Sequence, residues 1–186
     1  MDLNMLEVEV KAHVSDFKPI KKRLAEIGAR EYKFEHQVDV YFNAPHKDFA
    51  KTDEALRIRE IPKPEGSDII LTYKGAKIDD KSKTRREIEV KIEDKENTVS
   101  ILENIGFKAV QTIKKDRIIY IFKDYIITLD KVYDVGEFVE IEKDVKEGED
   151  YQDILDNIFV ISRDLGIEKG FERRSYLEML ELNKKS

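Results

Sequence analysis

The chain has 186 residues, of which 40% are charged, and its formal net charge is −6. This length predicts a single domain over residues 1–186 that buries a real core, and the negative charge argues against nucleic acid as a partner. The absence of Cys excludes disulfides, thiolate metal sites and cysteine nucleophiles. The three His residues lack the spacing of zinc ligands.

The composition also bears on location and source. The N-terminus has no apolar signal region and no window approaches 18 apolar residues, so we expect a cytoplasmic protein without a membrane partner. A chain without Cys and Trp that is rich in Lys, Glu and Ile is typical of a thermophile.

The first predicted strand, 7–14, opens with the pentapeptide EVEVK. Alternate residues of a strand share a face, so Glu7, Glu9 and Lys11 point one way and the two Val residues point the other. A helix follows over about 16–27, where apolar residues recur at helical spacing and Gly28 provides the stop. Further strands are predicted at 37–42, 56–61 and 69–74.

The second half repeats this plan. The related pentapeptide EIEVK opens a strand over 87–92, and a helix over about 95–105 ends at Gly106. This recurrence favours an internal duplication, because a chance repeat of five residues would not bring the helix and the glycine with it. Strands at 117–122, 125–129 and 138–142 follow, and then helices at 151–165 and 173–184, with loops at 62–66 and 75–83.

The predicted fold class is α+β: a closed eight-stranded antiparallel β-barrel with helices packed outside. Short loops between successive strands predict antiparallel pairing, and eight strands suffice to close a barrel. Several strands carry charge on alternate positions, while the amphipathic helices need an apolar surface to pack on. The apolar strand face therefore points outward and the charged face lines the lumen, which requires water and a charged ligand inside. For any one strand, an exposed salt-bridge lattice is the alternative.

The charges on these strands are of both signs. Arginine and lysine side chains suit the oxygens of a triphosphate, and carboxylates suit hard divalent ions. Neither GxxxxGK[ST] nor GxGxxG occurs, so side chains would have to hold the phosphates. The acidic set is Glu7, Glu9, Glu87, Glu89, Asp130, Glu140 and Glu142, and the basic set is Lys11, Arg57, Arg59, Lys74, Arg85, Lys115 and Arg117.

An ordered series of motifs covers nearly the whole chain. EVEVK (7–11) is followed by HQVDVYF (36–42), TDEALRIRE (52–60), LTYKG (71–75), TRREIEV (84–90), KKDRIIY (114–120), ITLDKVYDVGEFVEIE (127–142) and SYLEML (175–180). This series resembles the CYTH family, the triphosphate tunnel metalloenzymes, which groups class IV adenylyl cyclases with thiamine and inorganic triphosphatases. The stretch 36–60 and the form GEFVEIE resemble the class IV cyclase branch.

The resemblance implies a role for each charged position. Glu7, Glu9, Glu140 and Glu142, with Asp130 beside them, would hold a pair of Mg²⁺ or Mn²⁺ ions. Glu87, Glu89 and Arg85 would complete the tunnel wall. The phosphate-binding set would be Lys11, Arg57, Arg59, Lys74, Arg85, Lys115 and Arg117, and the catalytic set Glu7, Glu9, Lys11, Glu140 and Glu142.

Other positions keep two interpretations. Gln37 and Asp39 would contact substrate or form a structural hydrogen-bond pair near the tunnel mouth. Tyr41, Phe42 and Tyr73 are expected in the core rather than stacked on substrate. Tyr176 would close one mouth of the tunnel or simply pack its helix.

The resemblance favours a class IV adenylyl cyclase, a lyase that converts ATP into cyclic AMP and pyrophosphate. The alternative is a hydrolase acting on thiamine triphosphate or inorganic triphosphate, since both activities use the same metal and cations. A third alternative, a module that binds triphosphate or polyphosphate without turnover, is less favoured because binding alone would need mostly cations. The partner is then a nucleotide or another triphosphate, and the oligomeric state stays open, a homodimer included.

Overall fold

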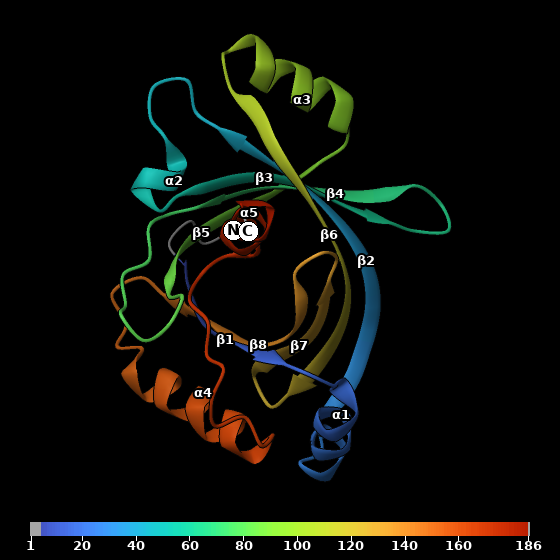
Figure 1. Cartoon of the computed structure of the whole chain (residues 1–186), viewed down its shortest axis with the longest axis vertical. Helices are drawn as coiled ribbons and strands as arrows, with labels where there is room; N and C mark the ends of the chain where they lie inside the picture. Colours follow the sequence, from blue (N-terminus) through green and yellow to red (C-terminus); the bar gives the residue numbers. More distant parts are fainter. Residues whose placement is uncertain (1–4, 186) are drawn as a thin grey trace.

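The structure, a computed structural model, describes residues 5–185, and within this range eight antiparallel strands form a closed barrel accompanied by five helices (Figure 1). Around the barrel the strands follow the order β1-β5-β4-β3-β2-β6-β7-β8. The strands are β1 (Met5–Val14), β2 (Arg30–Asn43), β3 (Ala55–Pro62), β4 (Ser67–Lys74), β5 (Arg85–Ile92), β6 (Lys108–Phe122), β7 (Tyr125–Val132) and β8 (Gly136–Lys146). The helices are α1 (Phe17–Glu26), α2 (Phe49–Thr52), α3 (Lys95–Asn104), α4 (Gln152–Asp164) and α5 (Tyr176–Lys185).

The predicted barrel is confirmed. The strand-helix-strand-strand order occurs in the second half of the chain as β5-α3-β6-β7, and in the first half it is interrupted by α2 between β2 and β3. Strands β2 and β6 begin earlier than the sequence indicated. They pair with each other from Arg30 opposite Ile121 to Asn43 opposite Lys108, and this long ladder satisfies the backbone of segments that lack strict alternation. Helix α2 was not predicted, because a single turn is too short to show periodicity.

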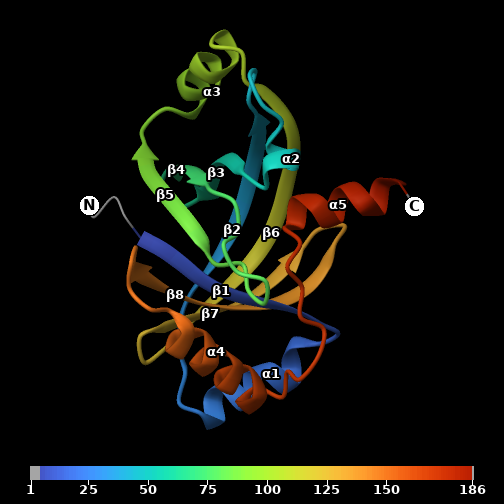
Figure 2. The ribbon, with the colours of Figure 1, turned by 90° about the vertical axis from the view of Figure 1, so that its left-hand side faces the viewer.

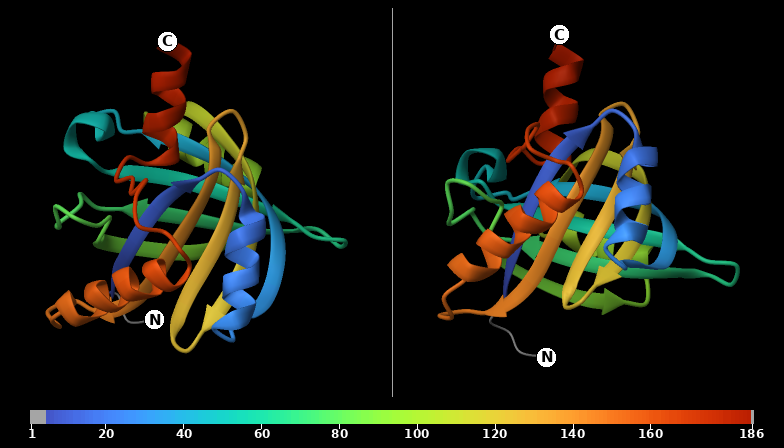
Figure 3. Two further views of the ribbon diagram at one scale, coloured as in Figure 1. Left: turned by 60° about the horizontal axis from the view of Figure 1, so that its bottom comes forward. Right: turned by 90° about the horizontal axis from the view of Figure 1, so that it is seen from below.

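Most of the apolar core lies outside the barrel wall, between the strands and the helices. Val8 and Val10 of β1 and Ile127 of β7 are buried there with the apolar faces of α1 and α4. Figure 3 shows both helices on the outer surface of the barrel. Asp16 caps α1 by accepting a hydrogen bond from the Lys18 amide, which fixes where that helix starts. The outward apolar face therefore leaves the inner face to the charged side chains.

Two smaller clusters complete the packing. Helix α3 covers Phe42 and Ile58 on the other side of the barrel. Helix α5 brings Tyr176 against Phe138 at one end of the lumen, with ring centroids 5.1 Å apart. In Figure 2, α5 and the start of β1 lie on opposite sides of the molecule. Among residues 5–185, no helix is long and apolar enough to span a membrane.

The barrel closes at a narrow seam. β1 pairs with β8 along its whole length, but it pairs with β5 only through Leu6 opposite Arg86 and Glu7 opposite Arg85. Beyond these two residues, the edge of β1 that faces β5 forms backbone hydrogen bonds with two other segments: the loop before β5 and the segment before α5. The Lys83 amide donates to the Glu9 carbonyl at 2.9 Å.

The segment before α5 continues this edge. The Glu172 amide donates to the Lys11 carbonyl at 2.8 Å, and the His13 amide donates to the Gly170 carbonyl at 2.9 Å. Glycine fits at position 170 because its φ is +82° and a Cβ would lie 2.9 Å from the His13 carbonyl oxygen. The C-terminal segment is therefore part of the barrel wall.

Candidate active site in the barrel lumen

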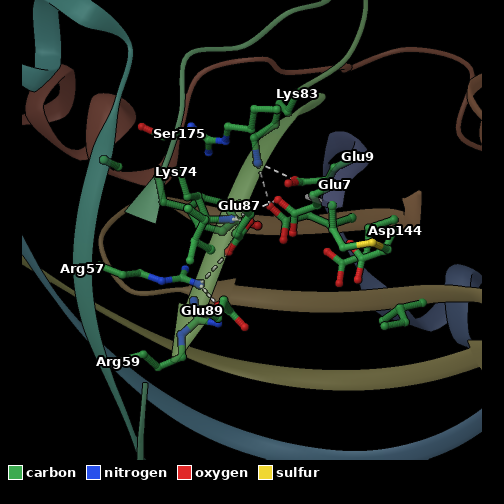
Figure 4. Close-up of a pocket in the computed structure, with 18 of the residues that line it drawn as sticks. Glu7, Glu9, Arg57, Arg59, Lys74, Lys83, Glu87, Glu89, Asp144 and Ser175 are labelled. Carbon is green, nitrogen blue, oxygen red and sulfur yellow. Dashed lines mark hydrogen bonds and ion pairs between the residues drawn. The ribbon is translucent and has the colours of Figure 1, made fainter. Parts of the chain in front are cut away.

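A cavity of about 420 Å³ occupies the lumen and is lined by side chains from all eight strands (Figure 4). The predicted inward face is confirmed, because Glu7 and Arg57 line this cavity while Val8 and Ile58 are buried on the outer side. Of the predicted site residues, those that line it are Glu7, Glu9, Arg57, Arg59, Lys74, Arg85, Glu87, Glu89, Lys115, Arg117, Glu140 and Glu142.

Three carboxylates form a cluster that could hold a cation. Glu7 and Glu9 of β1 and Glu142 of β8 each offer an oxygen, and these oxygens all lie within 4.8 Å of one another. Glu9 and Glu142 face each other in the β1–β8 ladder, so strand pairing brings them together. Burial and then the neighbouring Glu7 raise the pKa of Glu142 well above its usual range. A divalent ion fits this donor set, because hard oxygen ligands are those that Mg²⁺ and Mn²⁺ prefer.

Glu140 lines the same cavity but has different partners. Its carboxylate accepts a 2.5 Å hydrogen bond from Arg117 and lies 3.4 Å from the Lys83 ammonium. Although burial opposes it, Lys83 and Arg117 hold the pKa of Glu140 well below its usual range. Glu140 is therefore held ionised beside the carboxylate cluster.

Asp130 lies apart from the carboxylate cluster and does not line the cavity. Arg117 donates two hydrogen bonds to it, at 2.7 and 2.5 Å, and Lys115 lies 3.1 Å away. The Tyr176 hydroxyl donates to the same carboxylate at 3.0 Å. Asp130 thus fixes two cations and the Tyr176 hydroxyl in place and is not one of the three carboxylates of the cluster, and its role as a metal ligand stays a prediction.

The cations on β3 and β4 are held by acidic neighbours. Arg59 donates two 2.7 Å hydrogen bonds to Asp39, a bidentate pair that keeps its guanidinium in place. Arg57 lies 3.3 Å from Glu89, and its buried Nε has no hydrogen-bond partner. Lys74 contacts Glu7 at 3.0 Å and also contacts Glu87. These side chains present fixed positive charge to the cavity.

Lys115 and Lys11 differ in whether their side chains line the cavity. Lys115 lines the cavity, and burial together with Arg117 lowers its pKa to about 8. Lys11 does not line it: its ammonium donates a 2.5 Å hydrogen bond to the Arg174 carbonyl and lies 4.1 Å from the centre of the Tyr176 ring. Burial and the nearby Lys83 lower the pKa of Lys11 to about 7. Lys11 therefore packs against Tyr176 and is not among the residues that line the cavity.

The structure shows the partners of the polar and aromatic side chains for which the sequence left two interpretations. Gln37 donates to Glu35 at 2.5 Å while Asp39 binds Arg59, so these two side chains belong to separate pairs. Phe42 is in the core, as expected. The Tyr73 hydroxyl contacts Glu54 at 2.5 Å. Tyr41 and Tyr176 line the cavity and are also packed in one apolar cluster, so Tyr176 combines both expected roles.

The sequence did not single out two charged residues that line the cavity, Lys83 and Asp144. Lys83 lies in the loop before β5, and its ammonium contacts Glu9, as Figure 4 shows. No strand alternation applies to a loop, so only its basic composition could have pointed to it. Asp144 lines the cavity from β8, which continues past the predicted end at 142. Extending the alternation of Glu140 and Glu142 by one step would have found it.

Comparison with known proteins supports one family. The family model described as the CYTH domain matches residues 5–176. A protein of Methanocaldococcus jannaschii, provisionally named an adenylate cyclase, is 42% identical over 176 residues, which span 94% of this chain and 98% of the relative. An adenylate cyclase of Aeromonas hydrophila is 27% identical over 177 residues, spanning 94% of this chain and 88% of the relative.

A solved structure supports the same assignment. A protein of Pyrococcus horikoshii superposes with a TM-score of 0.86 at 44% identity, covering 96% of this chain and 99% of that one. The match of the family model over nearly all the described residues and the closed barrel with its charged lumen lead to one conclusion: the chain belongs to the CYTH domain family.

Proposed function

We propose that this protein is a divalent-metal-dependent enzyme that binds triphosphates in the barrel lumen and converts ATP into cyclic AMP and pyrophosphate. One observation carries the proposal: the carboxylate cluster of Glu7, Glu9 and Glu142 lines the same cavity as an array of fixed cations. A phosphate-binding module would need only the cations, whereas chemistry at phosphorus also needs a place for a metal ion.

The residues have separable tasks in this reaction. Glu7, Glu9 and Glu142 would hold Mg²⁺ or Mn²⁺, which when bound activates an attacking oxygen and neutralises phosphate charge. Arg57, Lys74 and the other lining cations would hold the phosphate oxygens. The lining cations are Arg57, Arg59, Lys74, Lys83, Arg85, Lys115 and Arg117.

In the cyclase reaction the ribose 3′-oxygen forms a bond to the α-phosphorus, and the bond from that phosphorus to the oxygen bridging to the β-phosphate breaks. The 3′-hydroxyl proton is released and pyrophosphate leaves with the electron pair of the broken bond. Arg59 is fixed by Asp39, and Arg117 by Asp130, so neither guanidinium has to be ordered when charge builds up on the leaving group.

The choice of cyclase over triphosphatase rests on resemblance. The stretch 36–60 resembles the class IV cyclase branch, and the relatives from Methanocaldococcus jannaschii and Aeromonas hydrophila bear the names of adenylate cyclases. A hydrolase would use the same cavity with water as the attacking group, so the products decide between the two activities.

The test offers ATP, thiamine triphosphate and inorganic triphosphate separately, each with Mg²⁺ or Mn²⁺, and identifies products by phosphorus NMR. We expect cyclic AMP and pyrophosphate from ATP, with inorganic triphosphate acting as an inhibitor that is cleaved poorly. Rapid release of orthophosphate from inorganic or thiamine triphosphate, without a cyclic product from ATP, would replace the cyclase by a triphosphatase.

A matched pair of variants ties the activity to the cavity. Glu9→Gln keeps the size of a buried side chain and removes its charge, so turnover should fall by about a hundredfold or more at low metal concentration. Glu93→Gln makes the same change at an exposed position between β5 and α3 and should leave turnover unaltered. Undiminished turnover of Glu9→Gln would remove Glu9 from the metal site.

A further inference from the structure

Lys83 places a positive charge on the carboxylates of the lumen without belonging to a strand. Its side chain is buried, with 5% of its surface exposed. The ammonium contacts the Glu9 carboxylate, one of the three acidic groups of the cluster, and lies 3.4 Å from a Glu140 oxygen. Glu9 and Glu140 are themselves buried, so this lysine is a direct counter-ion of Glu9 and shares Glu140 with Arg117.

The backbone that carries Lys83 is held from three sides. The Lys83 amide donates to the Glu9 carbonyl at 2.9 Å. The Ser82 hydroxyl lies 2.7 Å from that of Thr84 and 2.8 Å from the Asp79 carboxylate. Arg173, from the segment before α5, donates to the Ser82 carbonyl at 3.1 Å and to the Asp79 carbonyl at 2.5 Å. The loop therefore delivers the ammonium to a fixed place.

An ammonium at this place has a chemical consequence for any cation that binds there. Lysine donates hydrogen bonds to carboxylate oxygens but has no acceptor, and its four-carbon stem can rotate away while the backbone stays bound. A divalent ion needs an oxygen of Glu9 as a ligand, and an ammonium on the same carboxylate both occupies one of its oxygens and repels the ion. Binding of the ion is therefore opposed by the Lys83–Glu9 contact.

We propose that Lys83 is a built-in competitor for the metal site, whose ammonium neutralises Glu9 in the metal-free protein, shares Glu140 with Arg117, and opposes the binding of a divalent ion at Glu9. This inference rests on the metal site of the proposed function and adds the residue that sets its affinity. The positive charge of Lys83 stabilises the carboxylate cluster when no metal is bound, and the same charge lowers the affinity of the cluster for a metal ion.

The test is direct titration of the intact protein with Mn²⁺ in the absence of nucleotide, with free Mn²⁺ measured by electron paramagnetic resonance. Lys83→Gln should bind Mn²⁺ about tenfold more tightly than the wild type or better, since only in the wild type does the ion bind against a positive charge on the same carboxylate. Lys83→Met, which keeps much of the stem without the charge, should show the same gain and serves as the second variant if Lys83→Gln does not fold.

Two controls separate competition from general electrostatics. Lys83→Arg keeps a charged donor at the cluster and should bind Mn²⁺ with close to the wild-type affinity. Lys95→Gln removes a lysine that pairs with Glu60 at 2.5 Å and does not line the lumen cavity, so its Mn²⁺ affinity should be unchanged.

The outcomes distinguish this inference from the function on which it rests. Wild type that binds Mn²⁺, with equal or weaker binding by both Lys83→Gln and Lys83→Met, would overturn the competitor role and leave the metal site in place. Absence of Mn²⁺ binding by the wild type and by all Lys83 variants would overturn the metal site and the competitor together.

Discussion

Glu142 lies beside Glu7 and Glu9, and burial followed by Glu7 raises its pKa well above the usual range of a glutamate. A carboxyl whose pKa is higher in the folded than in the unfolded chain stabilises the fold at low pH, and this contribution is lost as the pH rises through the folded-state pKa. We predict that the free energy of unfolding of the metal-free protein falls between about pH 5 and about pH 8. Glu142→Gln should remove part of this fall. At the upper pH, its free energy of unfolding should exceed that of the wild type by about 1 kcal/mol or more.

The measurement is urea unfolding at both pH values in the presence of a chelator. Glu93→Gln, the exposed control, should follow the wild type at both. The same pH dependence in Glu142→Gln and the wild type would mean that Glu142 is not destabilised by its charged neighbours.

Lys115 leads to a second pH effect, on binding rather than stability. Burial and Arg117 lower its pKa to about 8, so the empty protein loses this lumen charge as the pH rises through that value. Because only the charged form attracts phosphate, the affinity for a non-hydrolysable ATP analogue should decline above about pH 8. Lys115→Arg stays charged over this range and should abolish that part of the decline. Isothermal titration calorimetry from pH 7 to 9 compares the two proteins, and parallel curves would contradict the assignment.

The sequence predicted most of the charged residues that line the lumen, because alternation along each strand places Glu7 and Glu9 of β1, and Arg57 of β3, on the inner face. It could not separate the carboxylates by role. Whether the Asp130 side chain contacts the carboxylate cluster or Arg117 depends on strand register and on side-chain direction across the lumen. Neither can be inferred from the sequence of a single strand. The sequence did not predict Lys83 as a lumen residue, because its position depends on how a loop folds against β1.

Arg173 connects two elements that are distant in the chain, the loop before β5 and the segment before α5. Replacing it with Ala removes the hydrogen bonds to the Ser82 and Asp79 carbonyls, so local opening of this loop becomes easier. We predict that amide hydrogen exchange of residues 79–83 becomes about tenfold faster in Arg173→Ala.

The neighbouring arginine is the matched control for this experiment. The Arg174 side chain hydrogen-bonds to Glu172 instead, so Arg174→Ala should leave exchange in the loop at the wild-type rate. Equal exchange in the two variants would show that the Arg173 contacts do not hold the loop.

The elements themselves were predicted where their periodicity is strong. Helix α4 was expected at 151–165 and runs from Gln152 to Asp164, because its apolar spacing and its glycine stop agree. β2 and β6 extend well beyond their alternating parts because each satisfies the backbone of the other. Pairing between distant segments is a tertiary effect, so local sequence underestimates such strands.

For the molecule as a whole, metal binding should appear as thermal stability. A ligand that binds only the folded state at about a hundred times its dissociation constant stabilises it by about 2.7 kcal/mol. For a domain of this size we predict a rise in Tm of roughly 5–10 °C with Mn²⁺. Differential scanning calorimetry measures it, and Glu9→Gln should lose most of the rise. A full rise in Glu9→Gln would place the ion elsewhere.

The architecture followed from one conflict in the sequence: amphipathic helices need an apolar surface, yet the strands carry charge on alternate positions. A barrel with charge inside resolves it, and the structure has this arrangement. The closure at the β1–β5 seam could not be predicted. It depends on the loop carrying Lys83 and on the segment around Gly170, which have no strand pattern of their own.

The carboxylate cluster combines the first strand of the barrel with the last: Glu7 and Glu9 come from β1, and Glu142 from β8. During synthesis β1 leaves the ribosome long before β8, which ends at Lys146. A nascent chain therefore carries two of the three acidic groups without the third until most of its length has been made. A divalent ion would meet the complete cluster only after β1 has paired with β8, so its binding would favour chains that have finished folding.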